Sequence, residues 1–255
     1  MSLTWDNWEA FPLLRWQGPE GIIAVFSGRQ GGVSKTPFAS LNLGLTTGDD
    51  RDAVAENRRR LCAAVGADPA RTVQNHQVHG TVVRVAEPML GGYLDPQGEL
   101  PKADALITRE ADLALVALSA DCVPIVIAAL DGSAVAVCHA GWKGLVAGVV
   151  EATVAALGPG AYAAAVGPCA GPQAYEVGDD VAVPLRERFG EGAAYGGTAD
   201  LAACAGLALF SAGVSPDAID IAGICTITET DDFFSYRRDG ATTGRQGVIA
   251  YREDV

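Results

Sequence analysis

The order of apolar and polar positions along the chain predicts alternating strands and helices. Apolar runs of strand length mark residues 21–27, 113–118, 123–130, 133–138, 162–166, 219–225 and 247–251. Helical spacing marks residues 52–65, 144–157, 179–189 and 199–212. Residues 72–85 are predicted to be extended with a break at His79-Gly80, and 88–101 form a surface loop rich in glycine and proline. Strands that neighbour one another, with helices between them, predict an α/β or α+β fold with mixed sheets.

A tight turn at Asp131-Gly132 joins two of these strands into a predicted hairpin. Cys122 lies nine residues before Asp131, and His139 lies seven residues after Gly132. Because paired positions of an antiparallel hairpin are counted outward from its turn, the two side chains are expected at one end of the sheet. The sequence therefore predicts a Cys/His pair there.

The net charge of −13 changes the picture by excluding classes of partner. Nucleic acids and anionic membranes attract basic surfaces, so neither is an expected partner. The chain has only three lysines, and its one basic run, residues 58–60, is predicted to lie on the solvated face of a helix.

Cysteine usage indicates a reducing compartment. The six cysteines form no Cys-x-x-Cys pair, so we expect neither a disulfide framework nor a zinc ribbon. The first residues lack the pattern of a signal peptide, and Asp121, Pro124 and Asp131 interrupt the most apolar stretch. A cytoplasmic protein is expected.

Three short motifs carry side chains suited to a metal: residues 77–80, 120–122 and 139–144. Two imidazoles and a thiolate, from His79, His139 and Cys122, would make a three-ligand zinc site with an open fourth position, as in catalytic zinc sites. The hairpin does not explain how His79 would reach the other two ligands. His76 is a competing ligand: residues three apart on an extended segment face opposite ways, so only one of the two histidines can face the metal. The alternatives are a buried core thiol and a core histidine bonded to a carbonyl.

Glycine and arginine clusters suggest an anion site less specifically. The loop at residues 28–32 could offer backbone amides and the Arg29 guanidinium to a phosphate. Arg237, Arg238 and Arg245 gather near the terminus and could bind an anionic substrate group. A plain surface turn and salt bridges explain the same residues. No Walker loop, dinucleotide fingerprint or Gly-x-Ser-x-Gly elbow is present.

Together with these motifs, residues 26–34, 41–44, 55–58, 175–178 and 233–239 make the chain resemble the YfiH-like family. This family is also called the multicopper polyphenol oxidase or laccase-domain proteins. The resemblance spans nearly the whole chain and implies one domain over residues 1–255, folded as a four-layer α/β/β/α sandwich. It implies a zinc ion held by His79, Cys122 and His139. One departure is Gln173-Ala174, where the family often has a cysteine pair.

The activity that the resemblance implies is purine nucleoside phosphorylase. Adenosine, inosine, guanosine and methylthioadenosine would be the substrates with phosphate, and adenosine deaminase activity would share the site. Zinc suits deamination because it activates water. The roles that we then expect are substrate or phosphate binding by Arg29, Asn42, Lys143 and Arg237, and catalysis by Cys122, Asp121 and Lys143. Asp121 would carry a proton or orient an imidazole.

Other readings of the same residues stay open. Three histidines cannot build several copper centres, whereas a single copper with Met89 as weak axial ligand could be built. Without metal, Cys122 could be a nucleophile with His139 as its base, in a hydrolase or an enzyme editing cell-wall precursors. The site could also be a metal or redox sensor without catalysis. The sequence leaves the preferred nucleoside and the oligomeric state open.

Overall fold

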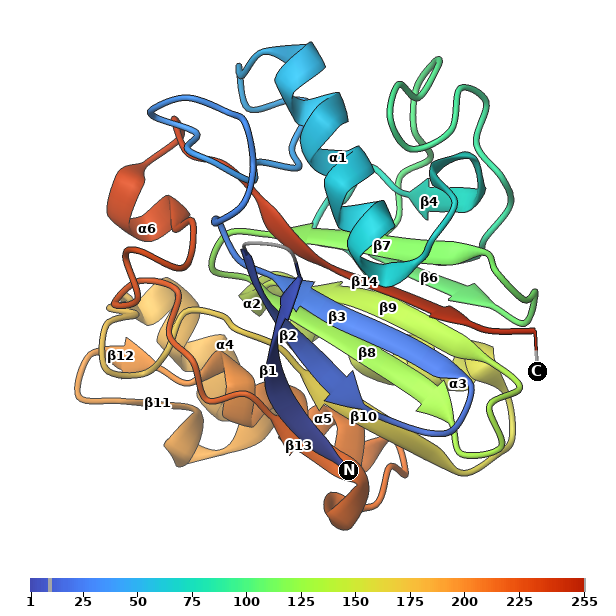
Figure 1. Ribbon diagram of the computed structural model, residues 1–255. Helices are drawn as coiled ribbons and strands as arrows, with labels where there is room; N and C mark the ends of the chain where they lie inside the picture. Colours follow the sequence, from blue (N-terminus) through green and yellow to red (C-terminus); the bar gives the residue numbers. More distant parts are fainter. Residues whose placement is uncertain (9–10, 255) are drawn as a thin grey trace.

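The computed structural model describes residues 1–8 and 11–254, which form two stacked six-stranded sheets (Figure 1). The first sheet has the order β1 (Ser2–Trp8), β2 (Phe11–Gln17), β3 (Ile22–Ser27), β14 (Gln246–Arg252), β7 (Ala114–Ser119), β4 (Thr72–Gln74). The second has the order β13 (Ile219–Ile221), β10 (Tyr162–Val166), β8 (Val123–Ala129), β9 (Val135–Ala140), β6 (Ala105–Thr108), β5 (Val83–Val85). The first sheet has a parallel pair at one edge and the second has one at each edge, and the remaining pairs are antiparallel, so both sheets are mixed, as predicted.

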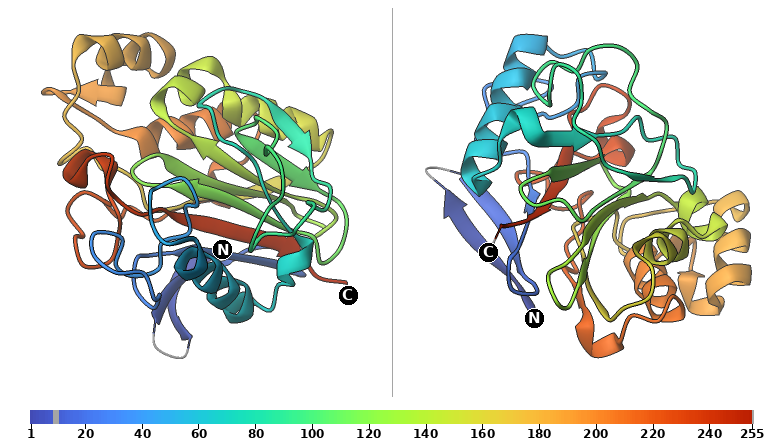
Figure 2. Two further views of the ribbon diagram at one scale, coloured as in Figure 1. Left: turned by 90° about the horizontal axis from the view of Figure 1, so that it is seen from above. Right: turned by 90° about the vertical axis from the view of Figure 1, so that its right-hand side faces the viewer.

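Helices cover the two outer faces of this pair of sheets. Helix α1 (Arg51–Val65) packs on the first sheet, and α2 (Trp142–Ala147), α3 (Val149–Leu157), α4 (Asp179–Phe189) and α5 (Leu201–Ser211) pack on the second. The views in Figure 2 place α1 and the α3–α5 group on opposite sides. A short helix, α6 (Tyr236–Asp239), and a two-stranded ribbon, β11 (Ala194–Tyr195) with β12 (Thr198–Ala199), complete the main elements.

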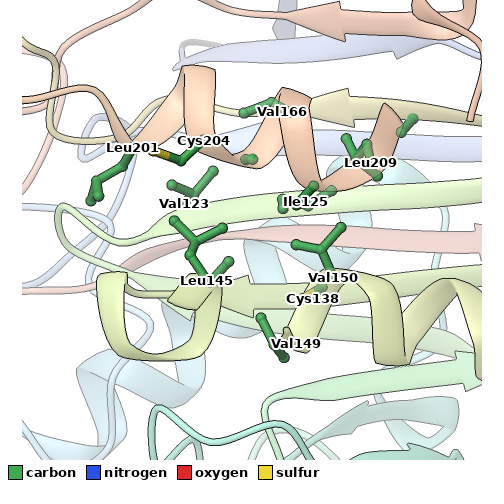
Figure 3. Close-up of a cluster of buried hydrophobic side chains, with 14 of the residues drawn as sticks. Val123, Ile125, Cys138, Leu145, Val149, Val150, Val166, Leu201, Cys204 and Leu209 are labelled. Atoms are coloured by element: carbon green, nitrogen blue, oxygen red, sulfur yellow. The ribbon is translucent and has the colours of Figure 1, made fainter. Parts of the chain in front are cut away.

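Alternation along each strand divides the interior into three cores. In β8, Val123, Ile125 and Ile127 face the α2–α5 helices, while Val126 and Ala128 face the other sheet. Figure 3 shows the helix-facing side chains of β8 against those of α2, α3 and α5. β7 alternates in the same way between the inter-sheet core and the core beneath α1. Three cores separate four layers, so the α/β/β/α sandwich is confirmed.

Most predicted elements are confirmed, with two corrections. The helix predicted over residues 144–157 is two helices, because Gly148 has φ 91°, a left-handed conformation that ends α2 and begins α3. The strand predicted over 219–225 keeps its ladder only for Ile219–Ile221. The Asp131-Gly132 turn joins β8 to β9 as predicted, with φ 70° at Gly132. Within the described residues, no helix is long and apolar enough to span a membrane.

The prediction for the basic run at residues 58–60 was wrong in its first residue. Arg58 is fully buried, and it donates to the carbonyls of Leu43 and Tyr93 and to the side chain of Gln74. Arg59 and Arg60 instead pair with Glu56 nearer the surface. One turn of α1 therefore carries a buried cation beside two solvated ones, a difference that charge patterning alone does not show.

Candidate metal and substrate site

The hairpin brings Cys122 and His139 together as predicted. Pro124 pairs with His139 and Val123 with Ala140, so Cys122 lies one residue beyond the ladder, beside the end of β9. One detail differs from the prediction: His139 lies within β9 rather than after it.

His79 is brought to the same place by a buried carboxylate that sequence reasoning missed. Asp104 is 2% exposed, and it accepts hydrogen bonds from three consecutive backbone amides, those of Val78, His79 and Gly80. The same carboxylate lies 2.9 Å from His139 Nδ1. One side chain thus fixes the loop that carries one ligand and the ring of another. Its only signal in the sequence is an acidic residue directly before the short apolar run of β6.

A second anchor ties this loop to the first sheet. The Gln77 amide donates to the Leu118 carbonyl at 2.6 Å and accepts from the Leu118 amide at 2.8 Å. In this way a side chain extends the ladder of β7 where β4 has ended. His79 itself has φ 60°, a left-handed conformation, so the chain turns sharply at the ligand.

The three candidate ligands fit a single tetrahedral metal ion. Their ligand atoms all lie within 4.8 Å of one another, and His79 Nε2 is 3.6 Å from Cys122 Sγ. Zinc bonds of 2.3 Å to sulfur and about 2.0 Å to nitrogen place such atoms about 3.5 Å apart. His139 Nδ1 is engaged by Asp104, so Nε2 is the nitrogen available to a metal. His76 is not in this group; its backbone forms an isolated parallel β-bridge with Lys102, and it lines the same cavity as His79.

The charged forms of Cys122, His139 and Asp104 stabilise one another. Burial alone would raise the pKa of the Cys122 thiol, but His139 and His79 outweigh burial and lower this pKa to about 6. Burial alone would lower the pKa of His139, but the Cys122 thiolate and Asp104 outweigh burial and raise this pKa to about 9. Burial also opposes ionisation of Asp104, but His139 and the amides of Gly80 and His79 keep its pKa below the ordinary value. A thiolate, the form that binds metals, is therefore available at neutral pH.

Gly141 leaves the space that the ligands occupy. A Cβ at this position would lie 2.7 Å from the His79 ring and 3.1 Å from Cys122 Sγ. A larger residue would push both ligands aside, which explains the glycine that follows His139-Ala140.

No hydrogen bond of Asp121 within the described residues reaches an imidazole, so its role as a proton carrier or an imidazole orienter stays a prediction. Its carboxylate accepts hydrogen bonds from the hydroxyls of Thr226 and Ser235 and from the backbone amide of Arg237. The carboxylate that touches an imidazole is that of Asp104. Asp121, which has φ 86°, instead fastens the segment around α6 to the loop that carries Cys122.

The three candidate metal ligands line a cavity of about 1200 Å³. Three aromatic side chains line it, Trp142, Tyr175 and Tyr236. The charged lining is basic, although the whole chain is acidic: five basic side chains stand against the carboxylates of Glu99 and Asp121. The basic side chains are Arg51, Lys102, Lys143, Arg237 and Arg245. A cavity with this lining suits an anionic or partly anionic ligand with a flat ring.

The structure brings two of the four predicted binding residues to this cavity. Lys143 and Arg237 line it, each over an aromatic ring, with Lys143 Nζ 5.5 Å from the Trp142 centroid and Arg237 Cζ 4.7 Å from that of Tyr175. Arg237 also donates to the Glu176 carbonyl. Arg245, one of the three clustered arginines predicted as candidates for binding an anionic substrate group, lines it as well.

The other two predicted binding residues, Arg29 and Asn42, hold loops together outside the cavity lining, and their binding roles stay predictions. Arg29 donates to the carbonyls of Ala39 and Thr230, and its own backbone amide donates to Asp232. The Arg29 backbone amide, which belongs to the glycine loop at residues 28–32, is therefore not free to bind a phosphate. Asn42 is fully buried and accepts from the backbone amides of Gly44 and Arg245.

The only axial methionine available to a copper site is engaged elsewhere. Met1 is exposed at the chain start, and Met89 Sδ accepts a hydrogen bond from the Gln74 amide at 3.4 Å. The His₂Cys donor set, with a carboxylate behind one imidazole, could hold a metal ion.

Comparisons with known proteins show which family the chain resembles over nearly its whole length. Residues 23–253 match the model of a family described as multi-copper polyphenol oxidoreductase laccase. A Xylella fastidiosa protein named purine nucleoside phosphorylase is 42% identical over 253 residues, covering 92% of this chain and 94% of that protein. An Escherichia coli K12 protein named purine nucleoside phosphorylase YfiH is 39% identical over 253 residues, covering 93% and 96%.

Solved structures share the fold over nearly the whole chain. The crystal structure of YlmD from Geobacillus stearothermophilus superposes with a TM-score of 0.87 at 33% identity, covering 98% of this chain and 99% of that one. That of a Bacillus licheniformis protein called hypothetical protein YfiH gives a TM-score of 0.89 at 27% identity, covering 97% and 98%. The mixed two-sheet architecture is therefore common to all three.

Proposed function

This chain belongs to the family described as multi-copper polyphenol oxidoreductase laccase, and on that premise we propose that it is a zinc-dependent purine nucleoside phosphorylase with adenosine deaminase activity. The observation that carries the proposal is the His79, Cys122, His139 group in the wall of a cavity with a basic and aromatic lining. Relatives named purine nucleoside phosphorylase, aligned over more than nine-tenths of the chain, support the same class of enzyme.

The chain's own residues divide the work in this proposal. In phosphorolysis a phosphate oxygen forms a bond to the ribose C1′, the C1′–N9 bond breaks, and its electron pair leaves with the purine. Trp142, Tyr175 and Tyr236 offer faces on which a purine can stack. The basic side chains neutralise the phosphate, and Lys143 and Arg237 meet it at the exposed part of the cavity.

His79, Cys122 and His139 would hold the metal, with Asp104 fixing the His139 ring. A zinc ion there would supply Lewis-acid chemistry, which polarises an oxygen of a substrate or of water. Adenosine deamination, in which water replaces the C6 amino group, would draw on that chemistry.

A turnover assay tests the proposal. Inosine and phosphate should yield hypoxanthine, and adenosine without phosphate should yield inosine. The protein purified without added metal should carry about one equivalent of zinc. Cys122→Ala should lose both zinc and turnover, whereas Cys204→Ala, which removes a buried thiol of α5 that is not one of the candidate ligands, should keep both. Full turnover after the metal is stripped would exclude the zinc mechanism.

A second candidate function has one observation in its favour. Without metal, Cys122, His139 and Asp104 form a nucleophile, base and orienting carboxylate, the arrangement of a cysteine hydrolase. In metal-stripped protein, iodoacetamide at pH 7 should then modify one cysteine of the six, because the other five are buried. The rate should rise with a midpoint near pH 6, the pKa of Cys122, and zinc should protect. Ester hydrolysis only in the stripped protein would favour this second function, which includes the editing of cell-wall precursors. Ester hydrolysis in neither form would reject it.

A further inference from the structure

One hydroxyl in the cavity wall has no partner. Ser119 is 3% exposed, and its Oγ makes no hydrogen bond within the described residues. Ser119 nevertheless lines the cavity, at the end of β7 and three residues before the ligand Cys122. Buried polar atoms in folded proteins nearly always have a partner. An orphan hydroxyl beside a cavity therefore marks a place where a ligand atom would complete the bonding.

A guanidinium in the same wall lacks a carboxylate. Arg245 is half-buried, and its Nη1 donates to the carbonyls of Thr243 and Gly244 at 3.0 and 2.8 Å. Its Nε and Nη2 donate to nothing in the described part of the chain, where no carboxylate pairs with it either. One edge of the guanidinium is thus uncommitted, and this edge matches two oxygens of an oxyanion.

Strand pairing places these two groups at the same end of the first sheet. Ser119 pairs with Gln246 in the ladder between β7 and β14, and Arg245 directly precedes Gln246. Both residues stand beside the loop that leads to Cys122, so a ligand bound by them lies next to the metal ligands.

The arginine is held in position before any ligand arrives. Its backbone amide donates to Asn42 Oδ1 at 2.8 Å, and its carbonyl accepts from the Leu43 amide at 2.9 Å. Its stem packs against Gly44, where a Cβ would lie 2.9 Å from Arg245 Cγ. A cation fixed in this way loses little conformational entropy on binding.

Lys143 and Arg237 differ from Arg245 in exposure. All three lie over aromatic rings, with Arg245 Cζ 5.9 Å from the Tyr236 centroid, but Lys143 and Arg237 are exposed whereas Arg245 is half-buried. Long exposed side chains of this kind attract an anion to the opening, whereas Arg245 is partly desolvated and bonds it more strongly.

We propose that Ser119 and Arg245 form the subsite that binds inorganic phosphate, with the phosphate oxygens on the free edge of Arg245 and on the Ser119 hydroxyl. The inference rests on the proposed phosphorolysis for its biological meaning, but the subsite itself is a binding site that can be tested without turnover.

The first test separates the two substrates kinetically. With inosine saturating, Arg245→Met should raise the KM for phosphate at least about 30-fold, because a charge-assisted fork is lost. Ser119→Ala should raise it about 5- to 10-fold. The KM for inosine should stay within about twofold in both, and Arg245→Lys should restore part of the loss. Lys35→Met, which removes one exposed charge outside the cavity lining, is the control for net charge.

The second test measures binding directly, with inorganic phosphate titrated into the zinc-loaded protein by calorimetry. The same two variants should weaken this binding by similar factors. Ser119→Ala removes an atom with no partner in the protein, so it should fold normally and keep the test decisive if Arg245→Met does not. Unchanged phosphate affinity in folded Ser119→Ala and Arg245→Met, or a larger loss in Lys143→Met, would overturn the subsite. If the wild type binds phosphate through these residues and cleaves no nucleoside, the subsite stands and phosphorolysis fails.

Discussion

Asp104 and Arg58 are fully buried charged side chains of opposite sign, and each hydrogen-bonds a different kind of partner. Asp104 accepts from the amides of Val78, His79 and Gly80 and from His139, so its bonds end on two candidate metal ligands. Arg58 donates to the carbonyls of Leu43 and Tyr93 and to Gln74. It therefore joins three segments of the chain, and Gln74 of one of them lines the cavity.

The difference lies in the partners. Asp104 is paired with a histidine that can carry charge, so its effect reaches the metal through the orientation and basicity of that ring. Arg58 has only neutral acceptors and the face of Tyr93, 4.3 Å from its Cζ, and burial lowers its pKa. A buried cation without a counter-ion is costly, and neutral carbonyl dipoles must offset that cost. Asp104 thus acts on the candidate metal ligands, whereas Arg58 stabilises the fold.

The largest expected effect is on stability, from Arg58→Met. The substitution keeps an apolar stem but leaves two backbone carbonyls and the Gln74 amide oxygen without their donor, so we expect a loss of about 3 kcal/mol in the free energy of unfolding. Arg59→Met, one residue along the same helix and exposed, should cost less than about 1 kcal/mol. Urea unfolding of the zinc-loaded proteins measures both. Equal losses would contradict the distinction between a buried and a solvated arginine.

The next effect is on metal affinity, from Asp104→Asn. An amide cannot accept from three backbone amides and His139 as a carboxylate does, so zinc should bind about 10- to 100-fold more weakly. Asp121→Asn is the matched control, because Asp121 is also buried and also accepts three hydrogen bonds, but none from an imidazole. Competition with a chromophoric chelator gives both affinities. A control that loses as much zinc as Asp104→Asn would show that any buried carboxylate of this loop cluster has the same effect.

These two residues also show what can and cannot be predicted from the sequence. The hairpin count placed Cys122 beside His139 because local pairing obeys a fixed period. Asp104 and Arg58 act across 15 to 35 residues of chain, and no local pattern encodes such a contact. Asn42 and Arg29 lie outside the cavity lining for a related reason: polar residues in loops also serve to bond those loops together. Ser119 gave no signal at all, because an unpaired hydroxyl is a property of packing.

The smallest expected effect sharpens the comparison along helix α1, where Glu56 pairs with Arg59 and Arg60. Their hydrogen bonds lower the pKa of Glu56 from 4.5 to about 2. A carboxyl with a folded-state pKa below its unfolded value stabilises the fold fully above pH 4.5, and this contribution disappears as the pH falls toward 2.

Because these side chains are near the surface, we expect Glu56→Gln to cost no more than about 1 kcal/mol at pH 7. The difference between Glu56→Gln and the wild type should shrink steadily in urea unfolding at pH 7, 4 and 3, and salt should weaken it at pH 7. A difference that grows as the pH falls would contradict the assignment. Arg58→Met should show no such trend over this range, because none of its hydrogen-bond partners is a carboxylate.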